Sequence, residues 1–132
     1  MKVAVIGSRG LTVENLGQYL PKETDEIISG GAKGVDTSAA LYAKKHNITL
    51  TEIRPDYKRY RGGALLRRNL EIVAQADEVL AFWDGCSKGT LYVIEECRKK
   101  EIPIKIFLHI ESIYEEIKKS PNGYKNAYLS KK

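Results

Sequence analysis

The sequence predicts one α/β domain, with a five-stranded, mainly parallel sheet and helices on both faces. Three observations predict it. Short β-branched runs alternate with helical patterns, no two strand-like runs follow each other directly, and glycine-rich stretches follow several of the runs. Such alternation gives βαβ units, whose right-handed crossovers make the strands parallel and place helices over both faces.

The expected strands are short and apolar. The first, at residues 2–7, and the fourth, at residues 78–83, are continuous apolar runs typical of buried strands, whereas the third, at residues 48–53, alternates and is expected to be less buried. The remaining two are expected at residues 25–29 and 103–108.

Helices are expected between the strands, at residues 12–20, 35–46, 64–75 and 90–100, and after the last strand, at residues 112–119. Thr12 is a suitable N-cap for the first of these helices and Pro21 ends it. Residues 55–63 form a polar, aromatic loop. We expect the domain to occupy residues 1–120, followed by a basic tail at residues 121–132.

Composition limits the class of protein. The chain has 132 residues, 42% of them hydrophobic and 30% charged, which fits one globular domain. No apolar run approaches the roughly 20 residues that span a bilayer, and Met1 leads directly into a strand. We therefore expect a cytoplasmic protein with no membrane partner. Two cysteines make no disulfide framework, the two histidines lack a ligand pattern, and neither a metal nor a cofactor is expected.

The formal net charge of +5 is unevenly distributed. Residues 54–68 hold six basic side chains and one acid, and residues 117–132 hold five lysines and no acid. A basic tail is usually solvated. The central cluster is of more interest because it is expected to lie near the glycine loops.

Three glycine-containing loops follow the first, second and fourth expected strands, at residues 7–10, 30–36 and 84–90. The carboxyl ends of parallel strands share one edge of the sheet, where ligands bind in folds of this class. Amide N–H groups at a helix N-terminus attract anions. The loops therefore predict one phosphate-sized cradle.

The first loop offers three groups. Gly7 permits a sharp turn and close approach to a phosphate or ribose, Ser8 supplies a hydroxyl, and Arg9 a bidentate guanidinium. The alternative is a turn glycine followed by a surface charge. Neither the three-glycine dinucleotide fingerprint nor a Gly-Lys-Ser/Thr phosphate loop is present.

The second loop has three glycines within five residues, which indicates demanding backbone angles or close ligand contact. Asp36, in the first turn of the following helix, either complements the helix dipole or binds a ribose hydroxyl. In the third loop, Thr90 is either a phosphate donor or a helix N-cap, and Asp84 either accepts from a ribose or base or begins the turn.

Arginine and aromatic side chains complete the expected site. Arg68 lies with Asn69 in the early part of a helix, where a cation opposes the helix dipole unless an anion is near. Tyr57, Tyr60 and Trp83 are candidates for stacking on a base, although Trp83 ends an apolar strand and is equally suited to the core.

Together these stretches resemble the SLOG superfamily of Rossmann-like nucleotide-ligand-binding proteins, in particular its small YspA/YpsA-like members. The matching motifs are Val5-Ile6-Gly7-Ser8-Arg9, Ser29-Gly30-Gly31-Ala32-Lys33-Gly34-Val35-Asp36, Arg68-Asn69, and Phe82-Trp83-Asp84-Gly85 through Ser87-Lys88-Gly89-Thr90. The resemblance implies a Rossmann-like domain that binds a nucleotide or nucleotide-derived small molecule, as a sensor or binding module. The residues expected to bind the ligand are Gly7, Ser8, Arg9, Ser29, Gly30, Gly31, Ala32, Gly34, Asp36, Arg68, Asn69, Asp84, Gly89 and Thr90.

Two alternatives follow from more distant resemblances. Cytokinin-activating (LOG) phosphoribohydrolases cleave nucleoside monophosphates with a glutamate three residues after the threonine of their Gly-Gly-x-Gly-Thr motif. Here that position is Val93, and Glu95 comes later. The second glycine loop also resembles the DNA-processing protein A family, which implies single-stranded nucleic-acid binding. Relatives commonly dimerise through helices, so a homodimer is expected.

Overall fold

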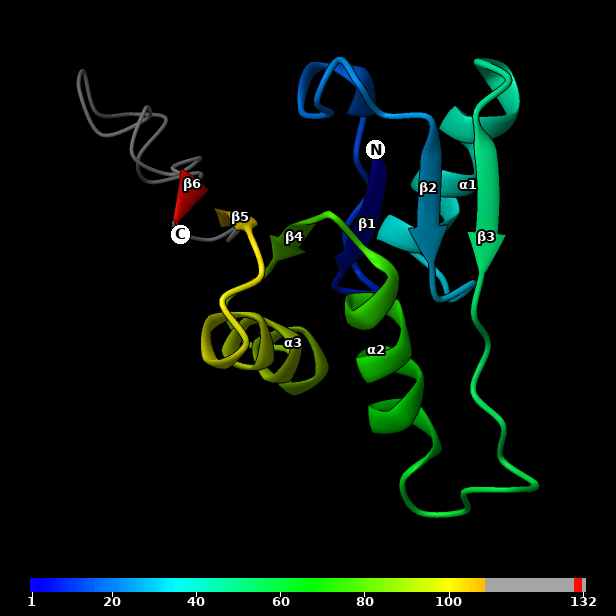
Figure 1. The fold of residues 1–132 in the computed structure, drawn as a ribbon, viewed down its shortest axis with the longest axis vertical. Helices are drawn as coiled ribbons and strands as arrows, with labels where there is room; N and C mark the ends of the chain where they lie inside the picture. The colour runs from blue at the N-terminus through cyan, green and yellow to red at the C-terminus, as the bar shows by residue number, and fades with distance from the viewer. Residues whose placement is uncertain (109–129, 132) are drawn as a thin grey trace.

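Five parallel strands form the centre of the fold (Figure 1). The computed structural model describes residues 1–108 and 130–131. The strands are β1 (Lys2–Gly7), β2 (Glu26–Ser29), β3 (Thr49–Glu52), β4 (Glu78–Trp83) and β5 (Ile104–Leu108). A two-residue strand, β6 (Ser130–Lys131), pairs antiparallel with β5 and was not expected from the sequence. The order is β3-β2-β1-β4-β5-β6.

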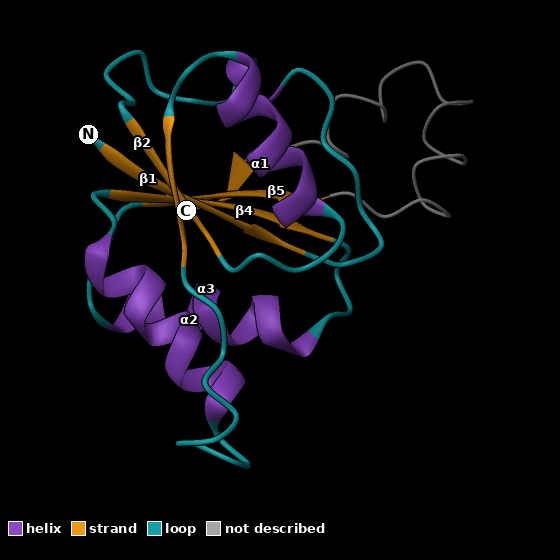
Figure 2. Cartoon of the chain, turned by 90° about the vertical axis from the view of Figure 1, so that its right-hand side faces the viewer, coloured by secondary structure: helices purple, strands orange, loops and turns teal. Residues whose placement is uncertain are grey.

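Helices cover both faces of the sheet (Figure 2). Helix α1 (Val35–Lys45) lies on one face, and helices α2 (Ala64–Gln75) and α3 (Lys88–Lys99) lie on the other. Each follows a parallel strand, so each begins at the carboxyl edge of the sheet. The predicted fold class, a mainly parallel α/β sheet with helices on both faces, is confirmed.

The core consists of two apolar layers because successive residues of a strand point to opposite faces. Along β1, Val3 and Val5 pack with α1, whereas Ala4 and Ile6 pack toward α2 and α3. Burial on both faces explains the continuous apolar runs of β1 and β4. Strand β3 is less buried, as its alternating pattern predicted.

One expected helix is wrong. Residues 12–20 contain only a short 3-10 turn, η1 (Leu16–Gln18), preceded by Asn15 in the left-handed region at φ 52°. The segment contains Gly17, a poor helix former. Burial of Leu16, 1% exposed, against the sheet anchors the segment instead. The helix expected at residues 112–119 lies outside the described residues, as does most of the predicted basic tail.

Helix α3 begins two residues before the expected start, with Ser87 rather than Thr90 at its N-cap. Among residues 1–108 and 130–131, no helix combines the length and apolar character needed to cross a membrane.

Candidate functional site

The direction in which successive strands are added to the sheet reverses between the neighbouring strands β1 and β4. The chain leaves β1 toward β2 on one side and leaves β4 toward β5 on the other. Loops that leave neighbouring strands in opposite directions open a crevice at their carboxyl ends, where α/β proteins bind ligands. The loops at residues 7–10 and 84–90 lie at this point.

A cavity of about 670 Å³ lies along this edge. Most of the residues predicted to bind ligand line it, from all three glycine loops and α2: Gly7, Ser8, Arg9, Gly30, Ala32, Asp36, Arg68, Asn69, Asp84, Gly89 and Thr90. Three of the predicted residues, Ser29, Gly31 and Gly34, are not part of the lining. The structure thus brings together groups that are far apart in the sequence.

The three residues outside the lining support the second loop. Ser29 is fully buried and its hydroxyl accepts a hydrogen bond from the Gly31 amide at 3.3 Å. Gly34 caps α1 at φ +75°, and a Cβ there would collide with the backbone of Arg9. Only glycine permits this approach of the first and second loops.

A chain of hydroxyls joins the loops after β1 and β4. The hydroxyls of Ser8 and Ser87 are 2.7 Å apart, and the Ser87 hydroxyl donates to that of Thr90 at 3.2 Å. The Asp84 amide donates to the Ser8 oxygen at 3.2 Å. Thr90 lies in the third position of α3 and is 5% exposed, so it is not the N-cap. These contacts fix the two loops relative to each other.

The Asp84 carboxylate holds the turn that precedes α3. Its Oδ1 atom accepts hydrogen bonds from the amides of Cys86 and Ser87, both at 2.8 Å. Burial raises the pKa of Asp84, but the bonds from the Ser87 and Cys86 amides outweigh burial and hold the pKa below its ordinary value. Of the two expected roles, beginning the turn is the one that the geometry shows.

The N-terminus of α3 is open toward the cavity. Ser87 makes no side-chain capping bond, and the first bond within the helix runs from the Leu91 amide to the Ser87 carbonyl. The amides of the first turn therefore lack a partner within the helix. Gly89 lines the cavity there, and its missing side chain leaves open space. An anion placed here meets the positive end of the helix dipole.

A buried arginine of α2 forms another part of the cavity wall. Arg68 is 9% exposed, and its Nη1 donates to the Gly30 carbonyl at 2.6 Å and to the Ile53 carbonyl at 3.4 Å. Its Nε donates to Asn69 Oδ1 at 2.9 Å. Within the part of the chain that the structure describes, Nη2 makes no hydrogen bond. Arg68 thus ties α2 to the ends of β2 and β3 and keeps donor capacity at the cavity wall.

Asp36 lies beside Arg68. It is 8% exposed, and its Oδ2 accepts a hydrogen bond from the Ala32 amide at 3.0 Å. Burial raises the pKa of Asp36, against the opposing effects of the Ala32 amide and Arg68, and burial lowers the pKa of Arg68, against the opposing effect of Asp36. A Cβ on Gly30 would lie 2.5 Å from Arg68 Nη1 and 3.0 Å from Asp36 Oδ2. Gly30 therefore makes room for both side chains.

The lining also contains residues that were not expected from the sequence, many of them apolar. They are Ile6, Gly10, Arg61, Gly62, Ala64, Leu65, Leu66, Ile72, Ser87 and Val93. Leu65 and Leu66, adjacent in the first turn of α2, are both exposed, and no local pattern in the sequence distinguishes leucines that line a cavity from leucines of the core.

The three aromatic side chains considered for stacking on a base differ in their position relative to the cavity. Tyr57 lines the cavity and is 58% exposed. Tyr60 instead packs under the guanidinium groups of Arg59 and Arg67, at 5.2 and 4.2 Å. Trp83 is half-buried against the core, and its Nε1 donates to the Ser87 carbonyl at 3.0 Å. Of the three, only Tyr57 lies at the cavity.

No cluster of three or more potential metal ligands occurs in residues 1–108 and 130–131. The carboxylates that line the cavity, Asp36 and Asp84, each accept amide hydrogen bonds. Glu95, considered for hydrolysis, is exposed on α3 and does not line the cavity.

Comparison with known proteins identifies the family. A model of the YspA, cpYpsA-related SLOG family matches residues 1–60. The chain belongs to this family. The matched segment of the SLOG domain carries the first two glycine loops, and the α2 and α3 sides of the cavity lie beyond it. Membership in this SLOG family points to a fold that binds nucleotide ligands.

A curated relative is similar to this SLOG protein as well. The Gene 61 protein of Mycobacterium phage D29 is 36% identical over 84 residues, which cover 59% of this chain and 67% of the relative. No solved structure is significantly similar to the chain.

Proposed function

We propose that the protein binds a nucleotide or nucleotide-derived small molecule in the cavity at the carboxyl edge of the sheet, as a sensor or binding module. One observation carries the proposal: three glycine loops and the first turn of α3 surround one cavity at the point where strand order reverses. Its volume of about 670 Å³ lies within the range of small-molecule sites.

The phosphate belongs at the loops after β1 and β4. The first-turn amides of α3, which have no partner within the helix, the Thr90 hydroxyl and the exposed Arg9 side chain supply neutral and charged donors there. Amides and arginine are the usual partners of phosphate oxygens in proteins. The hydroxyl chain from Ser8 to Thr90 holds this wall in place.

The sugar and base belong on the opposite side. Arg68 Nη2 and the Asp36 carboxylate together offer a donor and an acceptor, which matches the hydroxyls of a ribose. Beyond them, Tyr57, Leu65 and Leu66 form an aromatic and apolar rim suited to a planar base. The cavity therefore has a phosphate-binding end and an apolar end, as a nucleotide requires.

N-glycosidic cleavage has less support. A phosphoribohydrolase needs a carboxylate free to stabilise a ribosyl cation or activate water. Asp36 and Asp84 each commit one carboxylate oxygen to backbone amides, and Glu95, the carboxylate nearest in sequence to the expected position, lies outside the lining. Chromatography of adenosine monophosphate after long incubation with the protein tests the point, and release of free adenine would reverse this ranking.

Calorimetric titration with mono-, di- and cyclic nucleotides and ADP-ribose tests the proposal. We expect micromolar binding of at least one of them, weakened about tenfold by Arg9→Ala through loss of a charge-assisted hydrogen bond. Arg98→Ala, an exposed arginine in the last turn of α3 at the other end of the helix, is the control and should bind as the unaltered protein does. Absence of binding across the panel would refute the proposal.

A further inference from the structure

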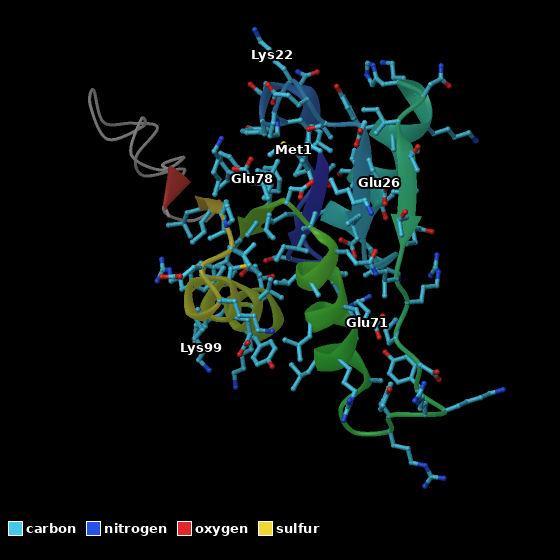
Figure 3. The ribbon with its side chains drawn as sticks, viewed as in Figure 1. Met1, Lys22, Glu26, Glu71, Glu78 and Lys99 are labelled. Carbon is cyan, nitrogen blue, oxygen red and sulfur yellow. The ribbon has the colours of Figure 1, made fainter. Side chains whose placement is uncertain are left out.

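The loop that joins β3 to α2 has two sides. It projects from the body of the domain at the end where α2 begins (Figure 1). Tyr57, Arg61 and Gly62 line the cavity. Other side chains of the loop point away from the domain into solvent (Figure 3). The loop therefore continues the wall of the cavity onto an outer surface.

That outer surface is basic and unneutralised. Lys58, Arg59 and Arg67 are exposed, and within the described residues none of them forms an ion pair. The one acid of the loop, Asp56, accepts a hydrogen bond from the Arg59 amide at 3.1 Å and so holds the turn. Positive charge of this density attracts a polyanion.

Part of this surface is ordered in advance. The guanidinium groups of Arg59 and Arg67 lie over the Tyr60 ring, at 5.2 and 4.2 Å. Stacking of this kind restricts long side chains before any ligand arrives. Tyr57, two residues before Arg59, lines the cavity and is 58% exposed, so it connects the cavity wall to this surface.

A single nucleotide leaves these cations unused. The cavity itself has Arg9, Arg61 and Arg68, which suffice for the phosphate of one nucleotide. Lys58, Arg59 and Arg67 do not line the cavity and have no role in the binding proposed above. Their arrangement fits further phosphates that extend outward from the cavity.

We infer that the protein binds a single-stranded oligonucleotide, with one nucleotide in the cavity and adjacent phosphates on Lys58, Arg59 and Arg67. The inference rests on the proposed nucleotide site. A basic track with aromatic rings is the common way in which proteins bind single strands. A duplex does not fit, because a paired base cannot enter the cavity without being extruded.

Fluorescence anisotropy with a labelled single-stranded DNA of about 12 nucleotides tests this inference. The variant is Lys58→Glu with Arg59→Glu, and the matched control is Lys44→Glu with Lys45→Glu, two exposed lysines at the far end of α1. Both double variants change the net charge equally. Titrations are done at about 50 and 200 mM salt.

We expect the loop variant to lower oligonucleotide affinity at least tenfold and to reduce the slope of log affinity against log salt by about 1.4, as two lost single-strand phosphate contacts would. Binding of the mononucleotide should change less than twofold, and the control variant should bind the oligonucleotide nearly as the unaltered protein does. These three results together support the inference.

Other outcomes overturn it. An unchanged salt slope in the loop variant, an equal loss in the control, equal affinity for a duplex of the same sequence, or equal displacement by poly-glutamate each contradict single-strand binding. If a mononucleotide binds and depends on Arg9 but the oligonucleotide binds no better, the inference alone fails. If neither binds, the proposed function fails with it.

Discussion

The cavity wall and the loop outside it hold positive charge in different ways. On the inner wall, Arg68 is 9% exposed and three of its hydrogen bonds go to Gly30, Ile53 and Asn69. On the outer loop, Lys58 and Arg59 are exposed. A buried charge depends on its partners for stability, whereas an exposed charge is stabilised by water. The inner wall is therefore part of the fold, and the outer loop is free to serve a ligand.

Replacement of Arg68 is expected to change the free energy of unfolding more than any other substitution considered. Arg68→Met removes three hydrogen bonds and leaves the carbonyls of Gly30 and Ile53 without this donor, so we expect a loss of roughly 3 kcal/mol in the free energy of unfolding. Arg61→Met, on the loop, should change it by less than about 0.5 kcal/mol. Urea denaturation measures both. Similar values for the two variants would show that Arg68 is not a structural residue.

Two glycine substitutions, one at the cavity wall and one on the outer loop, should show the same difference with a smaller change in stability. Gly30→Ala places a methyl group against Arg68 and Asp36, and displacement of the held guanidinium should cost about 2 kcal/mol. Gly62→Ala meets nothing within 4 Å and should be neutral or stabilising by roughly 0.5 kcal/mol. Thermal unfolding of both variants checks this. A stable Gly30→Ala protein would mean that Arg68 can move at little cost.

The smallest expected effect is on the pH dependence of stability, to which the two carboxylates of the cavity contribute differently. The pKa of Asp84 is held below its ordinary value of 3.8, so its ionised form stabilises the folded state above pH 3.8, and this contribution is lost as pH falls through the lower folded pKa. We expect Asp84→Asn to cost about 1 kcal/mol at neutral pH, because amides bond more strongly to a charged acceptor. The difference should shrink at pH values below 3.8.

The contribution of Asp36 to stability should change with pH in the opposite direction to that of Asp84. Because burial raises its pKa in the folded protein, its ionisation opposes folding as pH rises through that value. Asp36→Asn should therefore lose less stability than the unaltered protein between acidic and neutral pH. Denaturation curves over this range measure both variants, and parallel pH dependences for Asp36→Asn and Asp84→Asn would contradict the assignment.

Much of the fold and the position of the site could be predicted from local patterns. The helix expected at residues 64–75 and the strand expected at residues 78–83 agree with α2 and β4. These segments were readable because apolar periodicity and turn residues act over a few neighbours. The helix expected at residues 12–20 failed, because packing of Leu16 decided the conformation of that segment. The homodimer, the cytoplasmic location and the domain boundary at residue 120 stay predictions.

Within the site, the sequence indicated the glycine loops but not how they are joined. Ser87 was missed as the N-cap of α3 and as the partner of Ser8 because serine is common in loops and its bonding depends on a residue 79 positions away. Leu65 and Leu66 were missed as cavity lining because a position on a helix does not reveal what lies opposite it, whereas Tyr57, expected as a base-stacking residue, does line the cavity.

The sequence by itself determined where strands, helices and glycine turns occur, since these follow from the preferences of adjacent residues. Only the tertiary structure decided that Arg68 donates to the carbonyl of Gly30, 38 residues earlier. The same holds for the hydroxyl chain that links the loops after β1 and β4. Both depend on the order of strands in the sheet, which brings β4 beside β1. That order is set by the packing of the whole chain, because burial of both sheet faces is a property of all strands and helices together.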